Sequence, residues 1–411
     1  MKVRGIVHTM IIMTMCQSCV EEIQPVKFTA EEPYLVVDAR ISDRPVQQKV
    51  LLSRTFQFNE EPVFETKAQV YITGSNGARF NFIEQEQGSY YSETELNLIE
   101  TESYQLHIVL SNGESFVSNP EFLPQKVEIE NINPVRELNN FDEEGVSIYV
   151  SSISQPGSPS FFRYEYEESY KIIAPKWDPF EFEVIRYEPC FPNPFVVGLK
   201  TREIEQRICY SSNLSTDLIL ASTADQTENE INKNIRFIKR DNYIISHRYS
   251  ILVHQYAQSL EAYTFYAQLE DFSSSELLFS QVQPGFIAGN ISSTMNSSDE
   301  AIGFFEISSY SSKRIFFNYE DLFPGEDLPP YPINCENLGT PLLWPEGYHC
   351  AAPGVCDGNC ESPLIEQILA GLLVFAGERE NDFRIPYYTL PRACGDCTQL
   401  GSNIKPEYWV E

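Results

Sequence analysis

Short stretches in which apolar residues occupy every second position dominate the first third of this chain. The pattern runs through residues 35–41, 68–72 and 104–110. Side chains of a β-strand point alternately to its two faces, so a period of two predicts strands with one buried face. Turn signals follow at Ser75-Asn76-Gly77 and Asn112-Gly113. Because no amphipathic helix interrupts the series, we expect a β-sandwich over residues 34–125, either immunoglobulin-like or transthyretin-like.

The chain then changes character and continues as a second, larger β-rich region. Prolines and asparagines punctuate residues 119–134, and an acidic run at 142–144 precedes new strands. Because about 390 residues exceed what one hydrophobic core usually supports, we expect a second domain over 135–411. Its strands are expected near 146–150, 161–170, 202–210, 217–221, 243–256, 302–307 and 314–317.

One helix is predicted within this second region. Ser259 can cap a helix on which Ala262, Tyr263, Tyr266 and Leu269 recur at helical spacing, with an acidic residue in the first turn. A second, short helix is possible at 365–373, inside a segment rich in Pro, Gly and Cys. The predicted fold is therefore mainly β, with one or two helices and a disulfide-rich C-terminal segment.

The first eighteen residues are typical of a lipoprotein signal peptide. Lys2 and Arg4 precede an apolar run of about ten residues, too short to cross a bilayer. Ser18 before Cys19 fits lipoprotein processing better than Met15 before Cys16. We therefore expect cleavage after residue 18, lipidation of Cys19, a tether over 19–33, and attachment to a membrane through acyl chains alone.

Charge restricts the partners of the mature chain. Without residues 1–18 it carries 27 Lys and Arg against 59 Asp and Glu, a formal charge of −32. Such an excess of acid argues against nucleic acid as a partner. Glu21 and Glu22, directly after Cys19, resemble the acidic tether of surface-exported lipoproteins, so we expect them to act as a surface-export signal, with an ordinary solvated tether as the alternative.

Eight further cysteines are expected to form disulfides outside the cytoplasm. Cys190 and Cys209 are neighbours in sequence and far from the others, so we expect them to pair with each other. The other six allow fifteen connectivities that the sequence does not rank: Cys335, Cys350, Cys356, Cys360, Cys394 and Cys397.

Other chemistry at these residues is less favoured. A zinc site from Cys356, Cys360, Cys394 and Cys397 would suit a cytosolic protein better, and a redox role for Cys394-x-x-Cys397 lacks the βαβ context. The histidines His107, His247, His254 and His349 are expected to be structural, and the many aromatic residues are expected to fill cores. No catalytic residue, metal or cofactor is assigned, and we expect no enzyme.

Several short motifs together resemble a known family. They are Leu35-Val36-Val37, Tyr249-Ser250, Ser259 to Tyr263, Gln283-Pro284, Gly289-Asn290-Ile291, Gly303-Phe304-Phe305, Arg314, Cys394-x-x-Cys397 and Lys405 to Trp409. In order and spacing they resemble the Bacteroidetes lipoproteins grouped as domain of unknown function 4249, over nearly the whole mature chain. Gly401-Ser402-Asn403 departs from the Gly-Gly-Thr-Asn-like run common in members.

The resemblance implies a place in the cell more clearly than an activity. It implies a surface-exposed outer-membrane lipoprotein that serves a TonB-dependent transporter as an accessory or ligand-capture subunit. A structural subunit of an envelope assembly or surface-export complex is the first alternative. A hydrolase ranks last, because the sequence brings no nucleophile and base together.

Overall fold

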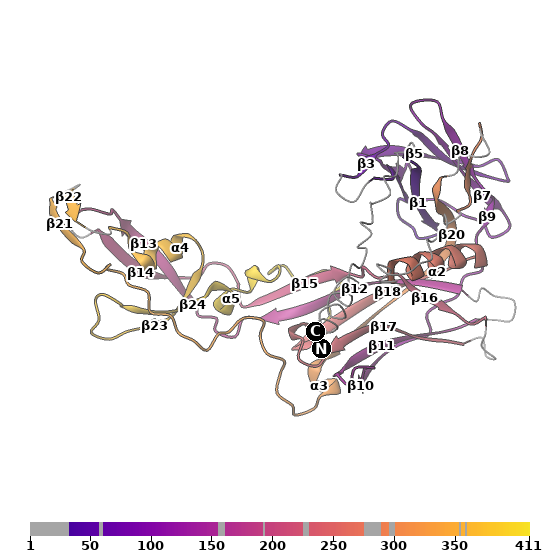
Figure 1. Ribbon diagram of the computed structural model, residues 1–411. Coiled ribbons are helices and arrows are strands. Elements are labelled where there is room, and N and C mark those ends of the chain that lie inside the picture. Colours follow the sequence, from indigo (N-terminus) through magenta and orange to yellow (C-terminus); the bar gives the residue numbers. More distant parts are fainter. Residues whose placement is uncertain are drawn as a thin grey trace, which may run out of the picture.

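The computed structural model describes residues 33–56, 61–154, 161–191, 194–224, 230–274, 289–295, 301–352, 355–357 and 360–411. For residues 272–274, 349–352 and 355–357 it describes the backbone alone. The fold is mainly β, as expected, and has three parts (Figure 1). We call them the N-terminal lobe, the central lobe and the arm.

The N-terminal lobe is formed by the alternating strands predicted from the sequence. In β1 the odd-numbered positions from Leu35 to Ile41 are buried, as the period-two pattern predicted. The strands of this lobe up to residue 122 are β1 (Leu35–Ser42), β2 (Lys49–Arg54), β3 (Val63–Phe64), β4 (Gln69–Gly74), β5 (Arg79–Glu86), β6 (Ser89–Ser92), β7 (Ser103–Val109), β8 (Ser115–Ser118) and β9 (Glu121–Phe122). They pair in the order β1-β2-β6-β5-β4-β7-β8 around one apolar core.

Two strands from later in the chain complete this lobe. The lobe therefore includes more than the predicted range of residues 34–125. Strand β19 (Ile291–Ser293) extends the sheet beyond β8, and the first half of β20 (Ile302–Asn318) pairs in parallel with β1. The second half of β20 pairs with β18 of the central lobe. A single strand of 17 residues therefore joins the two lobes, where the sequence suggested two separate strands.

The central lobe packs two sheets face to face. Its elements are β10 (Asn131–Leu138), β11 (Glu144–Ile153), β12 (Phe161–Ile173), β15 (Ile208–Leu214), β16 (Ile219–Ser222), β17 (Glu230–Lys239), η1 (Tyr243–Ile245), β18 (Arg248–Ala257), α2 (Leu260–Ser274) and α3 (Tyr319–Leu322). Strands β10-β11-β17 cover one face of the sheet β15-β12-β18-β20, and both contribute to one core. Helix α2 lies between the two lobes (Figure 1).

Helix α2 begins where the sequence predicted. The hydroxyl of Ser259 accepts a hydrogen bond from the backbone N–H of Ala262 at 3.2 Å, and Glu261 lies in the first turn. Ala262 and Tyr266 are buried against Phe304 of β20. The helix thus covers the end of the sheet that the two lobes share.

The arm comprises residues 176–206 and 333–396 and projects from the central lobe (Figure 1). Its elements are β13 (Phe180–Tyr187), β14 (Phe195–Thr201), β21 (His349–Ala352), β22 (Val355–Asp357), α4 (Pro363–Leu369), β23 (Leu373–Glu378), β24 (Tyr387–Pro391) and α5 (Arg392–Gly395), with η2 (Cys397–Gln399) at its root. These strands pair only as hairpins. The expected disulfide-rich C-terminal segment is therefore a structural part of its own.

Candidate functional site

A groove lies where the outward face of β1 meets the outward faces of β12 and β18. Two adjoining cavities of about 420 and 460 Å³ share Arg40, Arg44, Arg163 and Glu165. We call this the arginine groove. In a chain with a formal charge of −30, three arginines at one place single it out as a candidate site.

The strand alternation brings these side chains together. On β1, Arg40 points away from the core that its neighbours Ala39 and Ile41 enter. On β12, Arg163 and Glu165 face away from the core that holds Tyr164. Both strands pair with the long β20 region, directly or through β18, so their outward faces meet in one groove.

Arg163 is the most deeply buried cation of the groove. Its side chain is 3% exposed, pairs with Glu165, and lies 3.5 Å from the fully buried Glu306. Its guanidinium also lies 4.2 Å from the centre of the Tyr256 ring. Burial alone would lower the pKa of Arg163, but the carboxylates of Glu306 and Glu165 outweigh it and raise that pKa. The Nε atom has no hydrogen-bond partner among the described residues.

The two other arginines differ in how far they are neutralised. Arg40 makes a bidentate contact with Asp38, with both distances at 2.8 Å. Arg44 makes no ion pair with any described residue, and its guanidinium lies 5.3 Å from the centre of the Tyr310 ring. Arg44 therefore presents a charge that the described part of the chain leaves unpaired.

A histidine with restrained chemistry lines the second cavity. His254 contacts the Tyr310 hydroxyl through Nδ1 at 2.7 Å and Glu167 through Nε2 at 3.3 Å. Burial, and then the charge of Arg44, lower the pKa of His254 despite the nearby Glu167. The imidazole is thus neutral near pH 7 and fixed at both nitrogens, as a structural histidine would be. Such a groove can bind a polar ligand through fixed charges and tyrosine faces.

The predicted site residues fall into two groups. Cys19, Glu21 and Glu22 lie outside the described residues. The predicted pairing of Cys190 with Cys209 is wrong.

Instead, Cys190 bonds Cys360, Cys209 bonds Cys397, and Cys335 bonds Cys394. The physical reason is the hairpin between the first two cysteines. Cys190 lies in the turn between β13 and β14, whereas Cys209 lies on β15 at the hairpin's base. Eight residues of strand separate tip from base by roughly 26 Å, far beyond the Cα separation of about 7 Å that a disulfide permits.

The remaining cysteine predictions are resolved in part. Three of the four cysteines weighed for zinc, Cys360, Cys394 and Cys397, each bond a different cysteine. The backbone register of the β21–β22 hairpin sets Cys350 opposite Cys356. Among the described residues, no group of three or more His, Cys, Asp or Glu is arranged to hold a metal ion.

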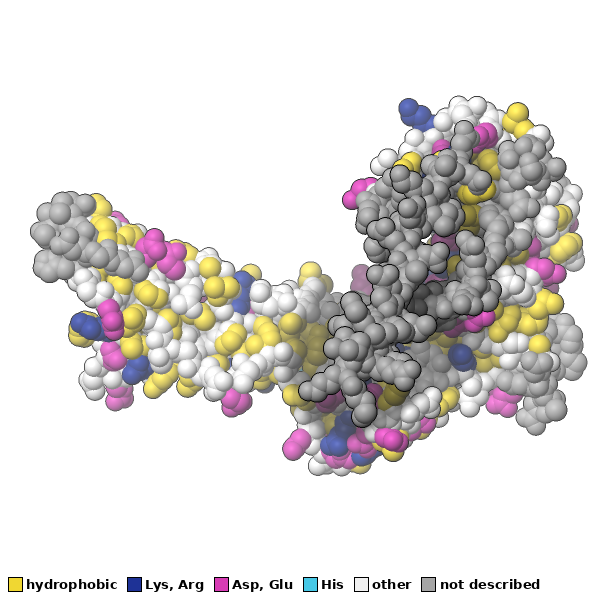
Figure 2. Space-filling view, viewed as in Figure 1, with side chains coloured by type: hydrophobic (Ala, Val, Ile, Leu, Met, Phe, Trp, Pro, Cys, Tyr) yellow, Lys and Arg dark blue, Asp and Glu magenta, His cyan; other side chains and the backbone are white. Residues whose placement is uncertain are grey.

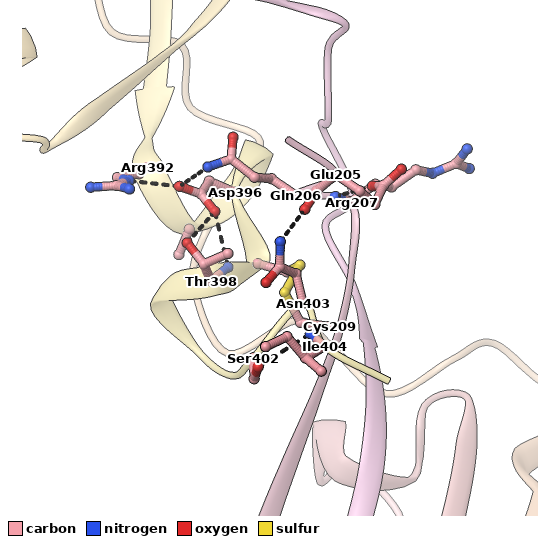
Figure 3. Close-up of a disulfide and its surroundings, with 12 residues drawn as sticks. Glu205, Gln206, Arg207, Cys209, Arg392, Asp396, Thr398, Ser402, Asn403 and Ile404 are labelled. Carbon is pink, nitrogen blue, oxygen red and sulfur yellow. Dashed lines mark hydrogen bonds and ion pairs between the residues drawn. A yellow bond between two sulfur atoms is a disulfide. The ribbon is translucent and has the colours of Figure 1, made fainter. Parts of the chain in front are cut away.

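The Cys209–Cys397 disulfide ties the root of the arm to the central lobe (Figure 3). Beside it, Asp396 accepts hydrogen bonds from Arg392 at 2.7 Å and from the Thr398 backbone at 3.0 Å. Burial would raise the pKa of Asp396, but the hydrogen bonds from the Thr398 hydroxyl, from Arg392 and from the Thr398 backbone outweigh it and lower that pKa. The root of the arm therefore combines a crosslink with a fixed charged turn.

Residues that carried the family resemblance close the N-terminal lobe. The side-chain amide of Asn290 accepts a hydrogen bond from the Phe305 backbone N–H at 2.8 Å and donates one to its carbonyl at 2.9 Å. Asn290 thereby substitutes for a strand partner of β20. Gly303 adopts a φ of +133°, and a Cβ there would lie 1.9 Å from the Val37 carbonyl oxygen. These residues are structural, whereas Gln283-Pro284 lies outside the described part.

The sequence reasoning missed the arginine groove. The available signal was the charged alternation of Arg163, Glu165 and Glu167 along a predicted strand. Such an alternation usually marks a solvent-facing surface, and only the covering α2 and N-terminal lobe turn it into a groove.

The comparisons with known proteins place the chain in a family without an activity. No curated protein matches it. None of the helices formed by the described residues has the length and apolar character needed to span a membrane. The model of the domain of unknown function DUF4249 matches residues 21–314, so the C-terminal motifs and the whole of the arm's second segment lie beyond the match. Because the match covers more than two thirds of the chain, this protein belongs to the DUF4249 family.

Proposed function

We propose that this protein is a lipid-anchored surface protein of the Bacteroidetes type that captures a ligand for a TonB-dependent transporter. The observation that carries the capture role is the arginine groove. It combines two cavities of about 420 and 460 Å³ with buried and half-buried charges that the fold holds in place. Sites of this size suit a small polar molecule.

Binding explains the groove better than catalysis does. Glu165 is engaged by Arg163, and both nitrogens of His254 are engaged by neighbours. Groups held in this way select a ligand by charge and shape but are poorly placed to accept or donate a proton. We therefore propose a binding protein and no enzyme.

The arm is the element that we propose to contact the transporter. It exposes large apolar side chains, which are unfavourable in water unless a partner covers them. Figure 2 shows apolar side chains along the visible face of the arm. The most exposed ones are Phe383 at 75%, Ile185 and Ile204 at 62%, Leu369 at 61%, Leu372 at 57% and Leu338 at 51%.

The anchor can be tested separately from the partner. Cys19→Ala should leave the chain uncleaved and mislocalised, whereas Cys16→Ala should change little because Cys16 is discarded with the signal. Replacing Glu21 and Glu22 by Ala should keep the lipid and reduce cleavage by protease added to intact cells. If only the Cys16 variant lost its acyl chains, Cys16 would be the lipidated residue and the assignment to Cys19 would be wrong.

The partner is tested by affinity purification from outer membranes solubilised in mild detergent. We expect a TonB-dependent β-barrel in near-stoichiometric amount. Recovery of the lipoprotein alone, or of an envelope assembly without a transporter, would contradict the proposal. The latter result would favour the structural-subunit alternative, which the projecting arm also suits.

A further inference from the structure

We propose that the smaller cavity of the arginine groove binds the carboxylate of a small organic acid, held between Arg44, Arg163 and Lys49. This inference rests on the proposed capture function and specifies the ligand class at the same site. The cavity has a volume of about 420 Å³, enough for a molecule of monosaccharide to disaccharide size or a short peptide end.

The lining of this cavity carries more positive than negative side chains. Its lining includes four cations, Arg40, Arg44, Lys49 and Arg163, and two anions, Asp38 and Glu165. A net positive lining is unexpected on a chain of charge −30, whose long-range field repels anions. With the buried Glu306 that pairs with Arg163 also counted, a local excess of one positive charge remains, and it favours an anionic occupant.

The distribution of partners shows where that occupant would lie. Asp38 engages Arg40, and Glu165 and Glu306 engage Arg163. Arg44 and Lys49 form no ion pair with a described residue, and Lys49 lies 5.6 Å from the centre of the Tyr91 ring. The unneutralised charge therefore lies on the β1–β2 side of the cavity.

Arg163 supplies the buried end of the site. It lines the cavity with a side chain that is 3% exposed, and its Nε has no hydrogen-bond partner among the described residues. An unsatisfied donor on a buried guanidinium is costly, and a ligand oxygen would satisfy it. Burial and then the charge of Arg163 would lower the pKa of Arg40, but Asp38 outweighs both and raises that pKa, so Arg40 and Arg163 are two like charges that an anion between them would bridge.

The chemistry of the donors favours a carboxylate among oxyanions. A guanidinium presents its N–H groups in a plane, which matches the two coplanar oxygens of a carboxylate. The Tyr256 ring, which also lines the cavity, offers an apolar face to the carbon skeleton beside that carboxylate. Together these features select a hydroxy- or amido-acid over a bare inorganic ion.

The test uses two pairs of probes that differ only in charge. Titration calorimetry compares galacturonate with galactose, and N-acetylalanine with N-acetylalaninamide. We expect the acid of at least one pair to bind and its neutral partner to bind at least about tenfold more weakly, as for a lost charge-assisted hydrogen bond. The pair that responds identifies a sugar acid or a peptide-like acid as the source.

Variants locate the site. Arg44→Gln should weaken binding of the acid about tenfold, and Lys49→Gln should weaken it less because that side chain is exposed. Arg79→Gln is the matched control, since it removes one exposed arginine from the same lobe outside the groove. Equal binding of acid and neutral probes, no binding up to about 10 mM, or an equal loss in Arg79→Gln would overturn the proposal.

The outcome is separable from that of the proposed function. If the transporter co-purifies and no acid binds, the ligand class is wrong and the partner stands. If an acid binds and no transporter is recovered, the site stands and the partner is wrong. Should Arg44→Gln fail to fold, Lys49→Gln decides between a local site and non-specific attraction.

Discussion

The N-terminal lobe and the arm solve the problem of stability in opposite ways. The lobe buries 21 apolar side chains in one core and contains no cysteine among its described residues. The arm has two small apolar clusters of four buried residues each. Two of the four residues in the second cluster are cysteines. Small cores rarely supply enough stabilisation alone, so the arm depends on crosslinks.

The N-terminal lobe and the arm should each be open to destabilisation with little effect on the stability of the other. The lobe is continuous with the central sheet through β20, whereas the arm joins the central lobe at a root held by Cys209–Cys397. Loss of crosslinks should therefore loosen the arm and spare the groove. Loss of the β1–β20 pairing should instead destabilise the N-terminal lobe and leave the arm folded.

The largest effect is expected from removing the root disulfide. Replacing Cys209 and Cys397 by Ser should destabilise the arm by about 2–5 kcal/mol, as for a crosslink that closes a long loop. Limited proteolysis should then cut first within 176–206 or 333–396, while the N-terminal lobe stays resistant. Equal sensitivity of both regions would show that they do not fold as separate units.

A somewhat smaller effect is expected from Asn290→Ala. The change removes both hydrogen bonds to Phe305 and leaves a buried N–H and a buried carbonyl unpaired, at a cost of about 2–4 kcal/mol. Hydrogen exchange should accelerate in β1, β19 and the first half of β20, with the arm unchanged. Faster exchange in the arm than in the N-terminal lobe would contradict the claim that the two parts are stabilised independently.

The third prediction concerns Glu121, a buried carboxyl that joins Asn290 to the cap of α2. It accepts hydrogen bonds from Asn290 at 3.0 Å and Ser259 at 3.3 Å. Burial, and then repulsion by Glu261 and Glu306, outweigh these bonds and raise the pKa of Glu121 from 4.5 to about 7. The folded state therefore holds the proton more tightly than the unfolded state between these pH values.

The free energy of unfolding should therefore fall as the pH rises from about 4.5 to about 7. Glu121 should account for about 2–3 kcal/mol of this fall. Urea unfolding of the N-terminal lobe at several pH values measures the slope. Glu121→Gln should flatten it, whereas the exposed Glu95→Gln should leave it unchanged. A slope that persists in Glu121→Gln belongs to another group.

The smallest effect is expected from an ion-pair ring where the chain leaves the central lobe for the arm. Glu144 and Glu326 each contact both Arg136 and Arg240, and the four side chains are 27–41% exposed. Because such pairs are well solvated, Glu326→Gln should cost less than about 1 kcal/mol, and high salt should erase the difference. Thermal unfolding in low and high salt tests this.

Sequence patterns predicted local structure well and long-range structure less well. The alternation of β1 and the Ser259 cap of α2 depend on neighbouring residues, and both predictions are confirmed. The strands predicted separately at 302–307 and 314–317 form one unbroken strand, β20, because the junction of the lobes buries Ser308, Ser309 and Ser311 between them.

The disulfides and the groove required tertiary information. Proximity in sequence suggested Cys190 with Cys209, but the intervening hairpin carries the first cysteine to its far tip. Arg163 resembled a surface residue of an alternating strand until α2 covered it. Neither relation is encoded in the residues immediately around these positions.

The central claim is that the groove binds ligand and the arm binds the partner, independently of each other. Recovery of the TonB-dependent transporter should be compared among the unchanged chain, Arg44→Gln, and a variant with Cys190 and Cys360 replaced by Ser. We predict full recovery with Arg44→Gln and a several-fold loss when the arm-tip crosslink is removed, because that crosslink joins the β13–β14 turn to the segment before α4. A loss with Arg44→Gln and full recovery with the arm variant would contradict the claim.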